Sequence, residues 1–255
     1  MRDIDYIVDF AAHLGREQLF AGANLERAND TMERVCKAYG LHEISVFSLS
    51  TIISLSATSL EGETHTRQIK VPGASIHLEK LRQLNDLAHK VCNETPNPEK
   101  LQDMLYEALL VPSYRAWIEM LGFVIAISSL CRIFGGNFAE LITVTLCTVL
   151  AYWLNRWLAR ANLNRIITNA INMVVTTAIF FFTVWIGFAY DMMAMLTPMS
   201  LMFIPGVPLV NSMRNILCGN EMNGILEFIK VILETLTLCL GVLIAYMLCG
   251  RWYTW

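Results

Sequence analysis

The chain has 255 residues, of which 55% are hydrophobic and only 16% are charged. Soluble domains average about 25% charged residues, so a wholly soluble protein is disfavoured. The charges are also unevenly placed: residues 1–112 hold 11 basic and 16 acidic side chains, whereas the longer segment 113–255 holds 8 and 6. The sequence therefore predicts a charged N-terminal domain, 1–112, followed by an apolar C-terminal domain, 113–255.

The N-terminal domain is predicted to be a small α+β domain. Apolar residues recur at helical spacing over 4–20, and a second helix is expected to follow Asn24 as its N-cap and to end at Gly40. The segments EISVFSLS, TIISLSAT and HTRQIKV are rich in β-branched residues, and the EGE between the last two is typical of a turn. Helical spacing returns over 76–91 and 99–110. The predicted order is two helices, three short strands and two further helices.

Residues of catalytic type form no recognised site pattern. The seven cysteines include no CxxC pair, and the five histidines show no HExxH or HxH spacing. The sequence contains no Walker loop, GxSxG or GxGxxG motif, which excludes an ATP-driven pump within this chain, and we predict no cofactor and no metal site. An intramembrane enzyme is disfavoured because no histidine follows His89, and Lys230 separates Glu227 from Glu234, the two acids that share one apolar stretch.

Five apolar stretches in the C-terminal domain are long enough to cross a bilayer, which takes about 20 residues. The alternative is a soluble helical core, but its amphipathic helices would carry charged faces, and no charged residue occurs from Ile166 to Tyr190. The predicted fold class is an α-helical multi-pass membrane protein with an N-terminal cytosolic α+β domain. The five predicted spans are 116–134, 138–157, 166–189, 192–213 and 226–249.

Basic residues in short loops predict the orientation of these spans. Arg156, Arg160 and Arg165 lie in the connection between the second and third spans, which carries no acid. We therefore expect this loop in the cytoplasm. Counting spans in both directions then places the N-terminus in the cytoplasm and the C-terminus outside.

The fourth predicted span contains an unusual group of helix-breaking residues, Pro205, Gly206 and Pro208. An interior proline removes a backbone donor and disrupts a helix by about 3 kcal/mol, and in hydrocarbon the freed backbone groups need other partners. Discontinuous helices present such groups to transported solutes, although a simple proline kink is the alternative. Asn211 and Asn215, four residues apart, favour a solute pathway because they would share one face of the helix that resumes.

Charged residues within or beside the spans are further candidates. Lys230 and Glu234 have i, i+4 spacing in the fifth span and are predicted as coupling or pathway charges. The alternative is a position at the cytoplasmic interface, with the ammonium of Lys230 extending into water. Glu119 and Glu140 lie near the ends of their spans and are expected at the interface.

Three segments resemble the N-terminal half of the threonine/serine exporter family. They are AGANLERANDTMERVCKAYGL (21–41), THTR (64–67) and IPGVPLVNSMRNILCGN (204–220). More narrowly, the chain resembles the larger subunit of the split, two-component form, a succinate exporter. The resemblance implies functional roles for Gly22, Ala23, Arg27, Asp30 and Thr31 in the cytosolic domain, and for Pro205, Gly206, Pro208 and Asn211 in the membrane.

The resemblance implies a subunit of a secondary-active exporter in a bacterial cytoplasmic (inner) membrane. Its solutes would be small polar metabolites, either threonine- and serine-type amino acids or a dicarboxylate such as succinate. Because the fused exporters continue with a second membrane half, the expected partner is a small separate membrane protein; no nucleic acid is expected. The alternative function is a membrane-anchored sensor or scaffold whose cytosolic domain binds a partner.

Overall fold

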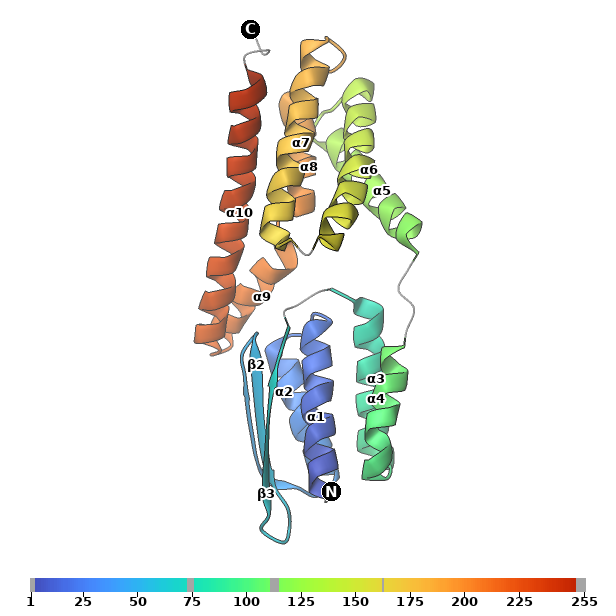
Figure 1. The fold of residues 1–255 in the computed structure, drawn as a ribbon, viewed down its shortest axis with the longest axis vertical. Coiled ribbons are helices and arrows are strands. Elements are labelled where there is room, and N and C mark those ends of the chain that lie inside the picture. The colour runs from blue at the N-terminus through green and yellow to red at the C-terminus, as the bar shows by residue number, and fades with distance from the viewer. Residues whose placement is uncertain (1–2, 73–75, 111–114, 162, 251–255) are drawn as a thin grey trace. The chain divides into compact units, whose positions relative to one another are not determined.

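The computed structural model describes residues 3–72, 76–110, 115–161 and 163–250 (Figure 1). The chain divides into two compact units. Unit 1 comprises Met1–Ser113 with Asn215–Asn223, and unit 2 comprises Tyr114–Arg214 with Gly224–Trp255. The predicted domain boundary at Pro112 lies outside the described residues.

Unit 1 has the α+β composition predicted from the sequence, and its three strands form an antiparallel sheet in the order β1-β2-β3. Ser45 pairs with Ser56 across β1 and β2, and Leu55 pairs with Arg67 across β2 and β3. Its elements are α1 Asp3–Phe20, α2 Leu25–Ala38, β1 His42–Ser48, β2 Ile52–Thr58, β3 Thr64–Lys70, α3 Leu78–Glu94, the 3-10 turn η1 Pro98–Lys100, and α4 Leu101–Leu109.

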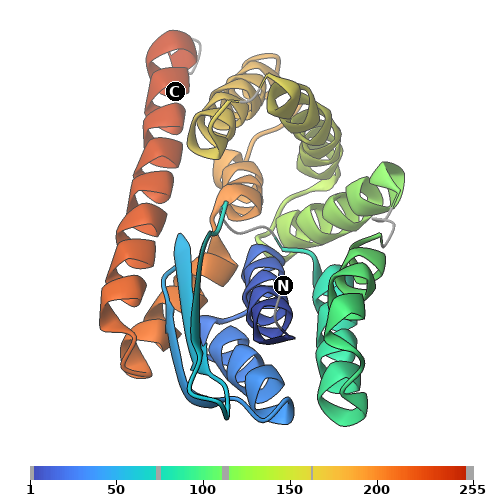
Figure 2. The same ribbon diagram turned by 60° about the horizontal axis from the view of Figure 1, so that its bottom comes forward.

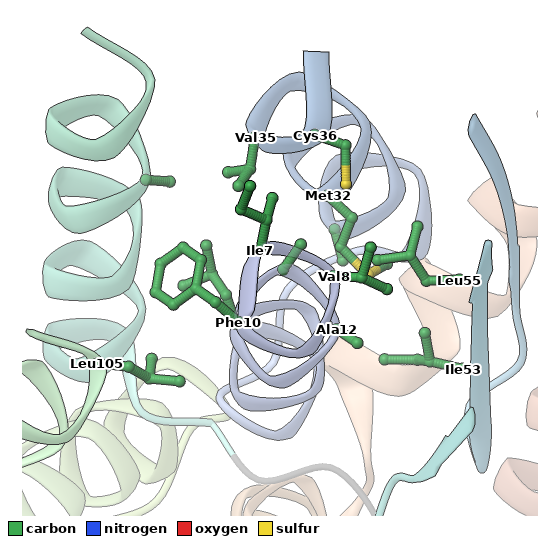
Figure 3. Packing of buried hydrophobic residues seen from close by; sticks show 14 of the residues in the cluster. Ile7, Val8, Phe10, Ala12, Met32, Val35, Cys36, Ile53, Leu55 and Leu105 are labelled. Carbon is green, nitrogen blue, oxygen red and sulfur yellow. The ribbon is translucent and has the colours of Figure 1, made fainter. Parts of the chain in front are cut away.

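Helix α1 forms the centre of unit 1 because it is apolar on most of its circumference. The helix contacts β2 and β3 on one side and α3 and α4 on the other. Figure 3 shows Ile53 and Leu55 of β2 directed toward α1. Phe10 lies on the opposite side of α1, the side that faces Leu105 of α4. The ring of Phe10 is completely buried. A single apolar core therefore joins the sheet to the helices of unit 1 (Figure 2).

The turn between α1 and α2 depends on the backbone freedom of Gly22. This residue has a φ of 95°, a conformation that glycine adopts without strain. The backbone N–H of Ala23 donates to the carbonyl of Gln18 at 2.9 Å, which closes the end of α1. Asn24 occupies the predicted N-cap position of α2 with an extended backbone, but its side chain makes no capping hydrogen bond.

The C-terminal part of the chain is helical, and the predicted multi-pass fold class is confirmed. Helices α5, α6, α7 and α10 are each long and apolar enough to cross a membrane. Helices α8 and α9 meet that test only as a pair bent by 57°, so the described chain contains 4 spans, or 5 if the bent pair is one span. The helices are α5 Ala116–Ile133, α6 Phe138–Arg160, α7 Arg165–Trp185, α8 Met192–Phe203, α9 Gly206–Leu217 and α10 Glu221–Cys249.

Helices α5 to α8 pack against one another, and α7 also approaches α10. Cys131, Met173, Phe180 and Met199 are completely buried between these helices. A Cβ added to Gly241 of α10 would lie 3.1 Å from a backbone carbonyl of α7, so the two helices come close there because Gly241 has no side chain. Most large apolar side chains of α10 are instead exposed, as expected for a surface that faces lipid.

Candidate functional site

The break between α8 and α9 lies at Ile204 and Pro205. Ile204 has an extended backbone (φ −67°, ψ 127°), and the carbonyl of Pro205 accepts the N–H of Leu209 at 3.0 Å to begin α9. Because Pro205 has no N–H, the carbonyl of Leu201 loses the donor that a continuous helix would supply. Pro208 is the third residue of α9, where the N–H of any residue would lack a helical partner. The bend is therefore centred on Pro205, and Pro208 is compatible with the helix that follows.

Beyond the break, the two predicted asparagines are buried to different extents. Asn211 is half-buried, whereas Asn215 is only 3% exposed. Between them, the completely buried Ser212 donates its hydroxyl to the carbonyl of Leu209 at 2.7 Å. The half-buried amide of Asn211 lies within unit 2, whereas Asn215 belongs to the short segment assigned to unit 1.

Lys230 and Glu234 are not brought together despite their i, i+4 spacing. Lys230 is exposed, whereas Glu234 is 8% exposed and lies on the buried face of α10 with Val231 and Leu238. Within the described part of the chain, the Glu234 carboxylate makes no hydrogen bond or ion pair. A buried carboxylate without a partner is costly, so Glu234 remains a candidate for solute binding, and Lys230 forms no ion pair with it.

The residues of unit 1 that the family resemblance indicated lie along the α1–α2 turn and one turn of α2. Gly22 and Ala23 form the turn, whereas Arg27 and Asp30 are exposed on α2. The carboxylate of Asp30 pairs with Arg34 at 3.1 Å, an exposed contact. The hydroxyl of Thr31 donates to the carbonyl of Arg27 at 2.8 Å. These contacts are local to the turn and helix and do not by themselves define a binding site.

A buried polar face on α7 is a feature that the sequence reasoning missed. The hydroxyl of Thr176 donates to the carbonyl of Asn172 at 2.8 Å, and the amide of Asn172 donates to the carbonyl of Thr168 at 3.1 Å. Among the described residues, the side-chain oxygens of Asn172 and Thr177 have no hydrogen-bond partner. The buried polar residues of α7, none more than 7% exposed, are Thr168, Asn169, Asn172, Thr176 and Thr177.

The spacing of these residues was a signal for this face. Positions 168, 169, 172 and 176 fall within about 100° of one another on a helix with 3.6 residues per turn, and position 177 lies about 80° further round. The stretch from Asn169 to Thr177 extends about 12 Å along the helix axis at about 1.5 Å per residue. In a membrane helix, a polar face turned inward indicates contact with other polar groups or with a pathway, because lipid offers no hydrogen bonds.

Glu140 was expected at the interface, but the structure shows that this residue is completely buried. Its carboxylate accepts the backbone N–H groups of Tyr190, at 2.9 Å, and of Asp191, at 3.1 Å. The other oxygen accepts the N–H of Asn137 at 3.0 Å, completing a capping box at the start of α6. Glu140 therefore joins the beginning of α6 to the α7–α8 connection. These hydrogen bonds account for the burial of its carboxylate and indicate a structural role.

At the other end of α6, a pocket of about 360 Å³ opens between α5, α6, α7 and α8. Asn164 caps the beginning of α7 by accepting the N–H of Ile166 at 3.0 Å, and this places Arg165 and Asn169 at the pocket. The hydroxyl of Tyr152 donates to the carboxylate of Glu119 at 3.0 Å. The pocket is lined by Glu119, Phe123, Tyr152, Asn155, Arg156, Ala159, Arg165, Asn169, Met202 and Phe203.

This pocket connects the features described above. Met202 and Phe203 immediately precede the α8–α9 break, and Asn169 is the first amide of the buried polar face that continues along α7 to Thr177. Glu119, expected only at the interface, is exposed and lines the pocket. The arrangement provides an open polar site that adjoins both a broken helix and a polar face inside the helices of unit 2.

The arrangement does not resemble a metal centre or a hydrolytic site. Among the residues that the structure describes, no group of three or more His, Cys, Asp and Glu side chains is placed to hold a metal ion. The pocket contains guanidinium, amide, phenol and carboxylate groups, which bind polar solutes through hydrogen bonds and charge.

Comparison with protein families gives one match that covers most of the chain. A family model described as "Putative threonine/serine exporter" matches residues 9–249. The match includes both the α+β unit and the helices that hold the broken span and the pocket. Comparisons with curated proteins and with solved structures give no match.

Proposed function

We propose that this chain, which belongs to the threonine/serine exporter family, is a subunit of a secondary-active exporter for small polar metabolites. The observation that carries the proposal is the buried polar face of α7, where the side-chain oxygens of Asn172 and Thr177 have no hydrogen-bond partner among the residues that the structure describes. Burying such groups is unfavourable unless they meet a partner. A solute or water that passes along α7 would supply that partner, and the broken span beside the pocket would supply further backbone groups.

The candidate solutes are threonine- and serine-type amino acids and dicarboxylates such as succinate. Cells that lack the gene and overproduce or are fed one of these solutes should accumulate it, and the wild-type gene should restore efflux. The experiment compares intracellular L-threonine, L-serine and succinate after dipeptide feeding or succinate loading. Unchanged efflux of all three solutes after deletion would contradict the proposal.

The proposal extends to the residues at the break. Pro205, Gly206 and Pro208 would shape the bend, and the half-buried amide of Asn211 would contact the solute. Asn211→Leu preserves approximate size but removes both amide donors and the acceptor. We expect efflux to fall strongly while the amount of inserted protein stays the same, as measured by efflux assays and membrane immunoblots.

The second membrane half is proposed to come from a small separate membrane protein. The support is the family resemblance, because the fused exporters contain a second membrane half, and transporters are often built from two such halves. The purified chain alone in liposomes should then show no solute transport above protein-free liposomes. Full transport by the single chain would refute this part of the proposal.

The proposed orientation in a bacterial inner membrane places the α6–α7 connection in the cytoplasm. The reason is that Arg156, Arg160 and Arg165 lie in or beside this connection, and basic loops favour the cytoplasmic side. Leu163 is exposed in this connection. In a variant of the protein whose other reactive cysteines have been replaced, Leu163→Cys should react with a membrane-impermeant maleimide only after the cells are opened. Reaction in intact cells would reverse the orientation.

A sensor or scaffold is the second candidate, because unit 1 is a well-packed domain that can bind a partner. The two functions differ in how they depend on α7. A scaffold would tolerate Asn172→Leu, since an apolar side chain keeps the helix in the membrane, whereas an exporter would lose efflux. Efflux that is unchanged by deletion of the gene would favour the scaffold, because a scaffold moves no solute.

A further inference from the structure

The pocket between α5, α6, α7 and α8 carries an excess of positive charge. Arg156 lies near the end of α6 and Arg165 is the first residue of α7, and both line the pocket. Within the described residues, neither guanidinium lies within 4.0 Å of a carboxylate. The single acid of the pocket, Glu119, is bound by the Tyr152 hydroxyl at 3.0 Å. Arg156 also lies beside the hydroxyl of Tyr152. Both guanidinium groups are therefore without a carboxylate partner that would compete with an anion.

A second and independent feature is the amide of Asn169. This residue lines the pocket but is only 7% exposed. In the part of the chain that the structure describes, its side-chain amide makes no hydrogen bond. Asn169 therefore offers amide donors and an acceptor to a molecule in the pocket.

The beginning of α7 adds to the same electrostatic preference. A helix N-terminus carries a partial positive charge and favours anions. Here Arg165, the first residue of α7, and Asn169, its fifth, both line the pocket, and Asn164 caps the N–H of Ile166. The helix end, the two guanidinium groups and the amide donors thus all favour a negatively charged oxygen group.

We propose that this pocket binds the carboxylate group of the solute, with Arg156 and Arg165 as its charged ligands and Asn169 as a hydrogen-bond donor. The inference rests on the proposed export function and names the chemistry by which this site captures its solute. A planar guanidinium matches a carboxylate with two parallel hydrogen bonds, which gives both affinity and orientation. A volume of about 360 Å³ accommodates a solute of a few heavy atoms together with water.

The carboxylate belongs either to a zwitterionic amino acid or to a dicarboxylate, and Glu119 distinguishes these sources. Its carboxylate attracts the ammonium group of an amino acid and repels the second carboxylate of succinate. We therefore expect L-threonine to bind more tightly than succinate, and Glu119→Gln to weaken L-threonine binding while strengthening succinate binding.

Arg160 provides the matched control. It lies in the same basic connection and contributes the same charge to the orientation of the spans, but it does not line the pocket. If Arg156 and Arg165 served only to orient the protein in the membrane, all three arginines would be equivalent in a binding experiment.

The experiment measures equilibrium binding to the full chain, purified in lipid nanodiscs. The probes are L-threonine, L-threoninol (which lacks the carboxylate), succinate and glycerol 3-phosphate. We expect Arg156→Gln and Arg165→Gln each to weaken L-threonine binding by about tenfold or more, and Arg160→Gln to change it by less than about twofold. Asn169→Leu should weaken binding as well, and L-threoninol should bind at least about tenfold more weakly than L-threonine.

Several outcomes would overturn the proposal. These are the absence of L-threonine and succinate binding to the wild-type chain, equal weakening by Arg160→Gln, or L-threoninol binding as tightly as L-threonine. Tighter binding of glycerol 3-phosphate than of either carboxylate would instead identify a lipid-headgroup site. Thermal unfolding of each variant verifies that the variant is folded. Arg165→Lys retains the positive charge and should therefore lose less affinity for L-threonine than Arg165→Gln.

Efflux measured on the same variants separates this proposal from the proposed function. If binding depends on the pocket but efflux in cells is unchanged by deletion of the gene, the carboxylate site stands and the export function fails. If efflux by the wild type is clear but unaffected by Arg156→Gln and Arg165→Gln, export stands and the carboxylate site is overturned.

Discussion

Helix α1 of unit 1 and helix α7 of unit 2 are both packed against other elements, and they bury opposite kinds of side chain. The buried face of α1 contains Val8, Phe10 and Leu14, all completely buried. The buried face of α7 contains Asn172 and Thr176, also completely buried, next to apolar residues such as Met173 and Phe180. On the outer side of α7, Ile167, Phe182 and Trp185 are at least 46% exposed.

The difference follows from the solvent of each unit. In water, burying apolar surface stabilises a fold by about 25 cal/mol per Å², so the polar side of a helix faces outward. In lipid, apolar side chains gain little by moving inward, and small or polar residues mediate helix contacts instead. An inward polar face is therefore compatible with stability in unit 2. Helix packing alone, however, does not require side-chain oxygens without a partner, and within the described part of the chain Asn172 and Thr177 each have one.

The largest expected effect on stability lies in the core of unit 1. Phe10→Ala removes a completely buried ring and should destabilise unit 1 by about 3–5 kcal/mol. Phe47→Ala is the matched control, since Phe47 of β1 is 58% exposed and should change stability by less than about 1 kcal/mol. Hydrogen exchange of the unit 1 backbone measures both. Equal losses would show that this core does not hold unit 1 together.

Substitution within the polar face of α7 should affect transport rather than stability. Asn172→Leu replaces an amide by an apolar group of similar size and should reduce efflux by about five- to tenfold, because one hydrogen bond to the solute or its water is worth about 1–1.5 kcal/mol. The thermal midpoint should stay the same or rise. A folded variant with wild-type efflux would remove α7 from the pathway.

A smaller effect is expected from a matched pair of threonines. Thr177→Val removes a hydroxyl that has no partner in the described structure, and efflux should fall several-fold. Thr237→Val removes a hydroxyl of α10 that donates to the carbonyl of Leu233 at 2.7 Å, and efflux should stay within about twofold. Equal effects in the two variants would indicate general sensitivity of the membrane helices rather than a role for the α7 face.

The two prolines at the break should also differ. Pro205→Ala returns an N–H that can donate to the carbonyl of Leu201, so the membrane helices should become more stable, by up to about 3 kcal/mol, and efflux should fall several-fold. Pro208→Ala lies in the first turn of α9, where the N–H gains no helical partner, and should have little effect. Thermal unfolding and efflux of both variants test this difference, and a larger effect of Pro208→Ala would contradict it.

The smallest expected effect concerns an ion-pair cluster of unit 1. Burial raises the pKa of Glu17, but the hydrogen bond from Lys80, at 2.8 Å, and the contact with Arg16 outweigh it, so the pKa lies below its usual value of 4.5. Because the folded-state pKa is depressed, the stabilisation is present above pH 4.5 and is lost as the pH falls through the folded-state pKa. Glu17→Gln should lower stability by about 1 kcal/mol at pH 7.

The control for this prediction is the pH profile itself. Thermal midpoints of the wild type and of Glu17→Gln should differ at pH 7 and converge in acid, where the carboxylate of the wild type is protonated. A difference that is constant with pH would mean that Glu17 stabilises unit 1 by packing and not by charge.

Much of the fold was determined by local sequence properties. The alternation of apolar residues in TIISLSAT predicts β2, and in the structure Ile53, Leu55 and Ala57 are indeed completely buried. Hydropathy predicts the spans, because crossing lipid requires a length of apolar chain whatever the neighbouring helices are. Proline chemistry likewise predicts the break in the fourth span, since Pro205 lacks the N–H that a helix requires.

Only the tertiary structure decided which polar groups meet. Glu119, Arg156, Arg165 and Asn169 come from three helices, and no sequence spacing brings Glu119 to the other three. Glu140 and Lys230 illustrate the same point: one is buried among backbone donors and the other is exposed, although both are charged residues of spanning helices. Hydropathy and helical period are properties of one segment, whereas the rotation and register of packed helices depend on side chains far apart in the chain.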